Sequence, residues 1–296
     1  MASHATQPAV RTGTGGDARR PAALWLPALF LLAFSFGTDD MVIAGILPDI
    51  ARDLAVSVPL SGQLVTVFAV AYALGAPPAA LLTARLPRRT VLVAAAGVFV
   101  VANLAAAAAP AYGALLAARA VAGLAAATAS PVAFAVAAAA APEGRQGRYL
   151  AVVGAGLTTS LVAGVPVGAW LGEALGWRAT MLFVAALAAV AGTALAVTLP
   201  PLPGGAAGRL RDRLAPLGRR RTLIGLTAMV PAGAGGMMPY VYLTEVAGRL
   251  GEVRGAGVAP LITVVGAAGV AGSLAGGRAV DALGARRALL LFASGM

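Results

Sequence analysis

The sequence predicts an all-α, polytopic membrane protein, and three observations lead to that prediction. The chain of 296 residues is 59% hydrophobic and only 11% charged, whereas a soluble domain carries about 25% charged residues. Long apolar runs recur along the chain, and the basic residues gather in short clusters between those runs. The charges are too few to cover a water-facing surface, so lipid is the expected solvent of most of the chain.

The apolar runs set the expected number of spanning helices. A helix needs about 20 mostly apolar residues to cross a hydrocarbon core of about 30 Å. Residues 1–21 are polar and form an expected disordered tail, not a cleaved signal peptide. The predicted spans are 22–47, 60–83, 89–109, 112–140, 149–172, 178–199, 222–244 and 256–277, and a ninth span begins near residue 287.

The distribution of arginine predicts the orientation of these spans. All 22 basic residues are arginine; 17 lie in the tail and in alternate connections, 4 lie in the other connections, and Arg119 lies inside a span. Positively charged loops stay in the cytoplasm, so the N-terminus and tail are expected inside. The loop 200–221, rich in Pro, Gly and Arg, is then a cytoplasmic linker. It divides a six-helix half at 22–199 from 222–296, where we expect helices 7, 8 and the start of 9 of an incomplete second half.

The composition excludes several classes of function. The chain has no cysteine, and its one histidine, His4, lies in the polar tail, so no metal site is expected. Without lysine there is no phosphate-binding P-loop, and no other enzyme motif or cofactor site is found. The net charge of +11 is spread over the loops and not gathered on a soluble face, so nucleic-acid binding is not expected. We therefore expect neither an enzyme nor a cofactor.

Two copies of a loop motif indicate that the chain contains duplicated halves. Residues 82–89 read LTARLPRR, including Arg85, Arg88 and Arg89, after Gly75-Ala76-Pro77. Residues 277–287 read GRAVDALGARR and contain Gly277, Asp281, Gly284 and Arg286. Ala84 precedes Asp281 by 197 positions, and Arg89 precedes Arg286 by the same 197. A motif that recurs at one offset between corresponding spans is the signature of an internal repeat.

Three further stretches complete the set of motifs. The first span ends in GTDDMVIAGILPDIA at 37–51, the fourth contains LLAARAVAG at 115–123, and the fifth runs from Gly156 through GVPVG at 164–168 to Gly172. The corner Gly176-Trp177-Arg178 then opens the sixth span.

Together these motifs resemble the Major Facilitator Superfamily, and more closely its 12-helix drug:proton antiporters of the bacterial chloramphenicol and sugar or nucleoside efflux type. The resemblance covers about residues 22–296 and implies a helical bundle that works by alternating access, here truncated at its C-terminus. The first loop departs from the family's G-x-L-A-D-R-x-G-R-R, because Ala84 replaces the Asp and Pro87 replaces the second Gly. The first loop therefore lacks the carboxylate that a charge contact at this position requires.

The charges inside the spans are the expected proton-coupling groups: Asp40 first, Asp39 second, and Arg119 as their partner. An ionised side chain in hydrocarbon costs about 2.5–3.5 kcal/mol, so it is functional by default. Lying about 18 residues, or about 27 Å, into its helix, the acidic pair is expected in the outer half of the membrane. The alternatives are that the carboxylates are solvated at the membrane edge and that Arg119 is satisfied by backbone carbonyls.

Small and aromatic residues suggest two further roles. Two rows of glycine would either let the two halves slide past each other or simply pack tightly. The rows are Gly164, Gly168 and Gly172, with Pro166 as a bend, and Gly269, Gly272 and Gly276. The candidate lining of an apolar substrate cavity, which could equally be packing residues, is Phe36, Phe68, Tyr72, Phe134, Met237, Tyr240 and Tyr242.

The sequence thus favours a proton-coupled exporter of a small amphipathic compound in the bacterial plasma membrane. Its partners would be the lipid bilayer, the substrate and protons, and no obligate protein partner is indicated. The alternative is a truncated, non-transporting remnant or a membrane interaction protein.

The predicted orientation can be tested directly. Reporter fusions at Gly16 and Gly205 should both give cytoplasmic signals, because the arginine-rich connections are retained inside. An alkaline phosphatase signal from the periplasm at either position would refute this topology.

Overall fold

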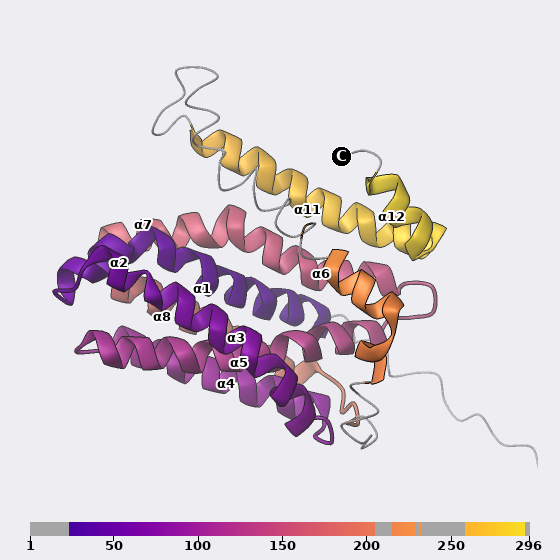
Figure 1. Ribbon diagram of the computed structural model, residues 1–296, viewed down its shortest axis with the longest axis horizontal. Helices are drawn as coiled ribbons and strands as arrows, with labels where there is room; N and C mark the ends of the chain where they lie inside the picture. The colour runs from indigo at the N-terminus through magenta and orange to yellow at the C-terminus, as the bar shows by residue number, and fades with distance from the viewer. Residues whose placement is uncertain (1–23, 205–214, 229–230, 232–257, 294–296) are drawn as a thin grey trace, which may run out of the picture.

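The computed structural model describes residues 24–204, 215–228, 231 and 258–293, and these residues form helices and no strand. Six of the helices or helix pairs are long and apolar enough to cross a membrane (Figure 1). They correspond to the first six predicted spans. Most of the predicted seventh span, including Met237, Tyr240 and Tyr242, and the Gly16 and Gly205 positions lie outside the described residues.

The helices of the first six spans follow in sequence order. α1 is Trp25–Asp53, α2 is Val58–Ser61, α3 is Gln63–Leu82, α4 is Arg88–Ala107 and α5 is Tyr112–Ala139. α6 is Gln146–Thr159, the π-helical turn η2 is Ser160–Gly164, α7 is Val165–Leu175 and α8 is Trp177–Thr198. Beyond the linker lie the 3₁₀ turn η3 (Ala215–Gly218), a helical segment at 220–228, α11 (Val258–Leu283) and α12 (Ala285–Ala293).

The first helix is longer than predicted, and this changes the depth of the acidic pair. The prediction ended the helix before Pro48, but α1 continues through this proline to Asp53. A proline inside a helix removes one backbone hydrogen bond and does not have to end it. Asp39 consequently lies at the midpoint of α1 and not in its outer half.

The fifth span contains a π-helical turn that the sequence did not predict. The backbone of α6 widens at Ser160–Gly164 and returns to α-helical geometry at Val165. Pro166 follows directly and has no N–H to donate to the carbonyl one turn earlier, inside the π-turn. π-turns of this kind occur mostly as single insertions at functional sites.

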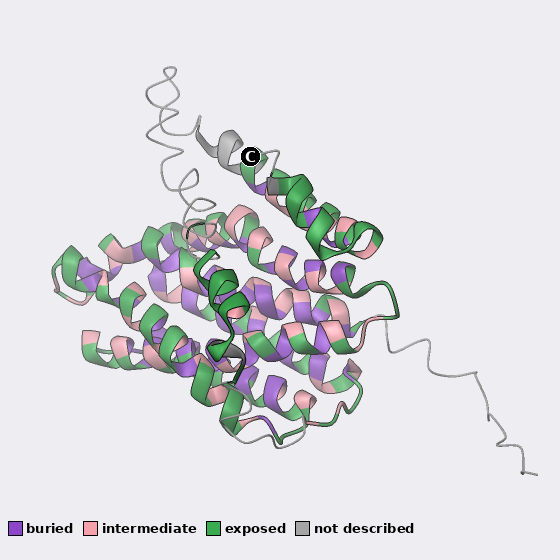
Figure 2. Cartoon of the chain, turned by 45° about the vertical axis from the view of Figure 1, so that its right-hand side comes forward, coloured by how far each residue is buried: buried purple, intermediate pink, exposed green. Residues whose placement is uncertain are grey.

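The six spans pack around α1 and α5. α1 lies against α6, α7 and α8, while α5 lies against α3 and α4, and α4 closes the group by packing on α8. Buried faces point into this bundle and exposed faces point outward (Figure 2). Exposed apolar side chains such as Leu74, Val101 and Val197 lie on the outer faces, as expected of a protein whose solvent is lipid.

The glycine row of the fifth span packs against α1, which corrects the predicted sliding surface. A Cβ atom at Gly164 would collide with Thr38; at Gly168 it would lie 2.6 Å from Val42 Cγ2; and at Gly172 it would lie 2.8 Å from Ile46 Cγ2. These glycines therefore join helices of the same half. A small-residue face permits close approach, but its spacing does not say which neighbour occupies it.

The α6 part of the fifth span contacts α11, in the predicted second half. α11 lies along α6 (Figure 1), and α12 turns away from α11 at Gly284, whose φ of +80° favours glycine. Of the predicted glycines on α11, Gly269 contacts Thr158, but a Cβ at Gly272 or Gly276 would meet nothing within 4 Å.

The α1 contact predicts a contrast between two glycines. Gly168→Ala should lower the free energy of unfolding by about 1–3 kcal/mol, because the new methyl group overpacks the space beside Val42. Gly97→Ala should be neutral or stabilising, because nothing lies within 4 Å of the new Cβ and alanine favours helix. Thermal unfolding in detergent measures both variants, and equal midpoints for the two would contradict the packing described here.

Candidate functional site

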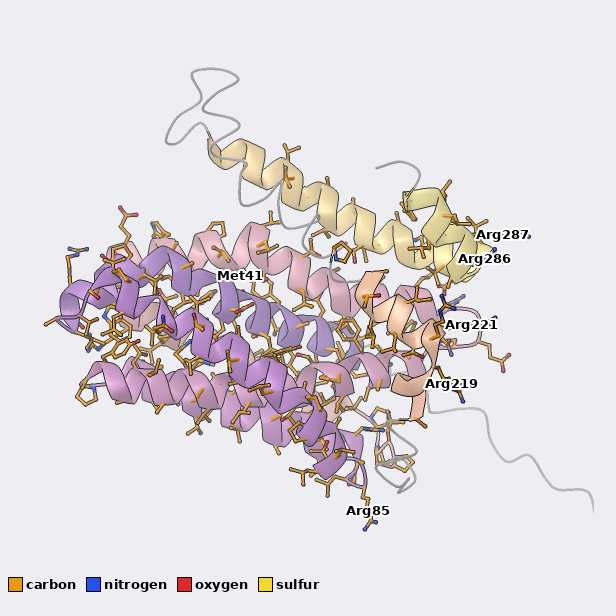
Figure 3. The ribbon with its side chains drawn as sticks, viewed as in Figure 1. Met41, Arg85, Arg219, Arg221, Arg286 and Arg287 are labelled. Carbon is orange, nitrogen blue, oxygen red and sulfur yellow. The ribbon has the colours of Figure 1, made fainter. Side chains whose placement is uncertain are left out.

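A buried ion pair joins the midpoint of α1 to the first third of α5. Arg119 Nη1 donates to Asp39 Oδ2 at 2.6 Å, and Arg119 Nη2 donates to the Asp39 carbonyl oxygen at 3.3 Å. Both side chains are fully buried. The guanidinium also lies 4.5 Å from the ring centroid of Phe68 on α3, a cation–π contact. Met41 in Figure 3 marks the part of α1 that carries this site.

The ion pair is not fully satisfied. Asp39 Oδ1, Arg119 Nε and the neighbouring Thr38 Oγ1 are buried without a hydrogen-bond partner among the described residues. Buried charges are expensive unless the remaining lone pairs and protons are bonded as well. An arrangement with spare donors and acceptors is one that can change its partners.

Asp40, which the sequence placed ahead of Asp39, lies in a different environment. Its side chain is half-buried and makes no ion pair or hydrogen bond among the described residues, whereas Asp39 holds Arg119. Adjacent helix positions point about 100° apart, so only one of the two carboxylates can face α5. The structure selects Asp39 as the partner of Arg119, and it contradicts the alternative of a pair solvated at the membrane edge for that residue.

The four predicted cavity residues that the structure describes do not form one lining. Phe36 is buried against Phe99, with ring centroids 4.7 Å apart in an edge-to-face arrangement, and is therefore a core residue. Phe68 lies under Arg119. Tyr72 and Phe134 are half-buried against the same core.

One end of the bundle is arginine-rich, and we name it the basic end; Figure 3 labels Arg85, Arg219, Arg221, Arg286 and Arg287 there. Asp281 of α11 reaches across this end to the first turn of α6. Its carboxylate accepts the Gly147 N–H at 2.6 Å and the Arg148 N–H at 3.1 Å, and Arg148 Nε lies 3.6 Å away. A carboxylate at a helix N-terminus bonds free N–H groups and is favoured by the helix dipole.

Glycines make this approach possible. A Cβ at Gly277 would collide with Ala151 and the Gly147 backbone, and a Cβ at Gly147 would lie 2.7 Å from Asp281 Oδ1. The sequence identified Asp281 and Gly277 as part of a conformational motif, but nothing in it indicated Gly147.

The matching loop of the first half makes no such contact. Ala84, at the position that corresponds to Asp281, is buried and carries no charge. Arg89 donates to the Ala196 carbonyl oxygen at the end of α8, and the Arg88 N–H donates to the Leu202 carbonyl oxygen at 3.0 Å. Arg85 and Arg286 are exposed. This loop is therefore bonded to the end of α8 and to the start of the linker.

The opposite end of the bundle holds a second set of charges, which the sequence did not predict as a site. Asp53, the last residue of α1, accepts hydrogen bonds from Trp177 Nε1 at 3.1 Å and from Arg178 at the start of α8. Arg178 also donates to the Ala109 carbonyl oxygen at 3.1 Å. These bonds fasten α1, the α4–α5 connection and α8 beside an open pocket of about 630 Å³.

Comparison with known proteins identifies the family. The sequence profile described as Major Facilitator Superfamily matches residues 29–296. An uncharacterized MFS-type transporter of Bacillus subtilis, YbcL, is 34% identical over 256 residues, which are 86% of this chain and 66% of that protein. A chloramphenicol resistance protein of Streptomyces lividans is 36% identical over 265 residues, 88% of this chain and 67% of that protein.

The fold is likewise that of a known transporter structure. A bacterial homologue of the human lysosomal transporter Spinster, in an inward-facing and unoccupied conformation, matches with a TM-score of 0.62 at 20% identity, covering 88% of this chain and 61% of that one. The chain spans about two thirds of the length of the relatives it matches. On the profile match and these relatives, the chain is a multi-pass membrane protein that belongs to the Major Facilitator Superfamily.

Proposed function

We propose that this protein exports a small amphipathic compound across the bacterial inner membrane in exchange for protons. The observation that carries the proposal is the buried, incompletely satisfied Asp39–Arg119 pair between α1 and α5. The chloramphenicol resistance protein and a probable sugar efflux transporter of Mannheimia succiniciproducens, 29% identical, support export as the direction of transport.

The chemistry of the pair suits proton exchange. Arg119 keeps its charge, so Asp39 is the member that can take up a proton. A proton on Asp39 removes the charge attraction to Arg119 and frees guanidinium donors in a dry site. A substrate group that donates to the Asp39 carboxylate would compete with the proton for the same oxygens, which is the requirement for exchange.

Alternating access needs contacts that form at one end and break when that end opens. The Asp281 contact with the first turn of α6 meets this requirement, because it joins the two halves at the basic end. With the predicted topology, the basic end is cytoplasmic. We propose that Asp281 closes the cytoplasmic side, and that the first half contributes no equivalent acidic contact because Ala84 stands at its position.

The role of the ion pair predicts a loss of coupled transport. Asp39→Asn should reduce pH-driven transport of radiolabelled chloramphenicol and of ethidium in inside-out vesicles to the level of vesicles without the protein, because the amide cannot carry the proton. Asp40→Asn is the matched control and should retain most of the transport. Removal of one member of a buried ion pair leaves the other charge unpaired and lowers stability by about 3–5 kcal/mol. A second variant therefore replaces both residues, Asp39→Asn together with Arg119→Gln. This double variant should fold normally and still show no proton-coupled transport.

Two results would contradict this proposal. Transport of neither compound by the wild-type protein would refute export of this substrate class. Normal pH-driven transport by Asp39→Asn would refute the assignment of Asp39.

The contact at the basic end predicts a change in conformational balance. Asp281→Ala should speed alkylation of a cysteine introduced as Ser273→Cys several-fold, because the α6–α11 contact opens more often. The chain contains no other cysteine, so the label reports this position alone. Arg278→Ala is the control, since this exposed side chain bonds, within the described part of the chain, only the Leu274 carbonyl oxygen of its own helix. Equal alkylation rates in both variants would show that Asp281 closes nothing.

A further inference from the structure

The π-helical turn Ser160–Gly164 lies between the ion-pair site and the second half. On one side it packs against α1, where a Cβ at Gly37 would collide with Ser160 and a Cβ at Gly164 would collide with Thr38. Thr38 directly precedes Asp39, and its Oγ1 is buried without a partner among the described residues. The turn therefore touches the backbone that carries the proposed proton site.

On the other side the turn reaches α11. A Cβ at Gly266 would lie 2.9 Å from Val162 Cβ and 3.1 Å from Val162 Cγ1. This is the last contact of an antiparallel seam of small residues between the fifth span and α11. The seam pairs Gly147 with Asp281, Ala151 with Gly277, Gly154 with Ser273, Thr158 with Gly269 and Val162 with Gly266.

We propose that Val162 is a positioning residue, which links the charge state of Asp39 to the contact between the halves by way of the π-turn. The inference rests on the proposed proton exchange at Asp39. It assigns Val162 no contact with proton or substrate. Its role is to convert a shift of α1 at Thr38 into a shift of α11 at Gly266.

The packing supports transmission through this route. Interiors packed at close contact cannot absorb a shift locally, so a displacement of Gly37 and Thr38 is passed to Ser160 and Gly164, which they contact. A π-turn has wider hydrogen bonding than the α-helix around it, so it is the place where the fifth span can deform. Val162 projects from this turn onto a glycine, where no side chain intervenes.

Few charged groups surround Asp39, so protonation of Asp39 itself is the event that would trigger the proposed link. Arg119 from α5 is paired with it, and Asp40 lies next to it on α1. Of the other elements in contact with α1, α3 and η2 carry no charged residue. α6, α7 and α8 each carry one near an end, namely Arg148, Glu173 and Arg178.

Spin labels can test the link without a transported compound. Cysteines introduced as Val197→Cys and Leu289→Cys lie on exposed faces of α8 and α12 in a chain that has no other cysteine. In lipid nanodiscs, the distance distribution between the labels should shift by several ångström between acidic and alkaline pH. Asp39→Asn should abolish that shift, because its amide does not titrate.

Substitutions at Val162 then separate the inference from general packing. Val162→Ala should leave a folded protein whose label distances no longer follow pH, while the isosteric Val162→Thr should retain the shift. Val167→Ala, on an exposed position one turn further along, is the matched control and should behave as wild type. Gly266→Ala should hold the distances in one state at both pH values. Val162→Ala in the same chain should restore the response, because the methyl group added at position 266 then fills the contact that the valine made.

The outcomes distinguish this inference from the function on which it rests. A wild-type protein without any pH-dependent shift would overturn the proton exchange itself. A shift that depends on Asp39 but persists in Val162→Ala would overturn only the role of Val162. If Val162→Ala does not fold, failure of the double variant to restore the response of Gly266→Ala would overturn that role as well.

Discussion

The structure depends on the placement of two opposite charges where neither water nor lipid headgroups can solvate them. Moving each ion out of water costs several kcal/mol, and the mutual attraction repays this only with good geometry. Asp39 and Arg119 meet at 2.6 Å, with the Phe68 ring against the guanidinium. Such a pair needs α1 held firmly beside α5, and the rest of the six-span bundle supplies that support.

The support comes from close packing and not from hydrophobic burial. Lipid tails are as apolar as the side chains, so helices associate in a membrane through van der Waals contact and backbone approach. The fifth span provides two such surfaces. Gly164, Gly168 and Gly172 receive α1, while the face from Gly147 to Val162 receives α11. The fifth span thereby packs both against α1, which carries the proposed proton site, and against α11.

The sequence predicted the features that a lipid environment imposes on composition, such as long apolar spans and rare buried charges. Six spans, the buried Arg119 and the role of Asp281 as a motif residue followed from apolar length, the rarity of charge in hydrocarbon and an internal repeat. The choice between Asp39 and Asp40 could not follow, because it depends on the rotation of α1 and on its continuation past Pro48. Glycine spacing predicted a close contact but not its partner. The bonds of Asp53 to Trp177 and Arg178 join residues more than 120 positions apart, which no local pattern reveals.

The two copies of the loop motif differ, because only the second contains an acidic residue, and this difference gives α6 its role in the proposed mechanism. Asp281 contacts the start of α6, but its counterpart Ala84 has no carboxylate, so the proposed closure of the basic end would rest on the contact between α6 and α11. The 14 residues of α6 separate this contact from the π-turn by about 21 Å. An α-helix of this length is stiff along its axis, so a displacement at the π-turn reaches the Gly147 end as a shift of the whole segment. The proton site and the acidic contact would then act on one rigid element, and a single acidic contact is sufficient to connect them.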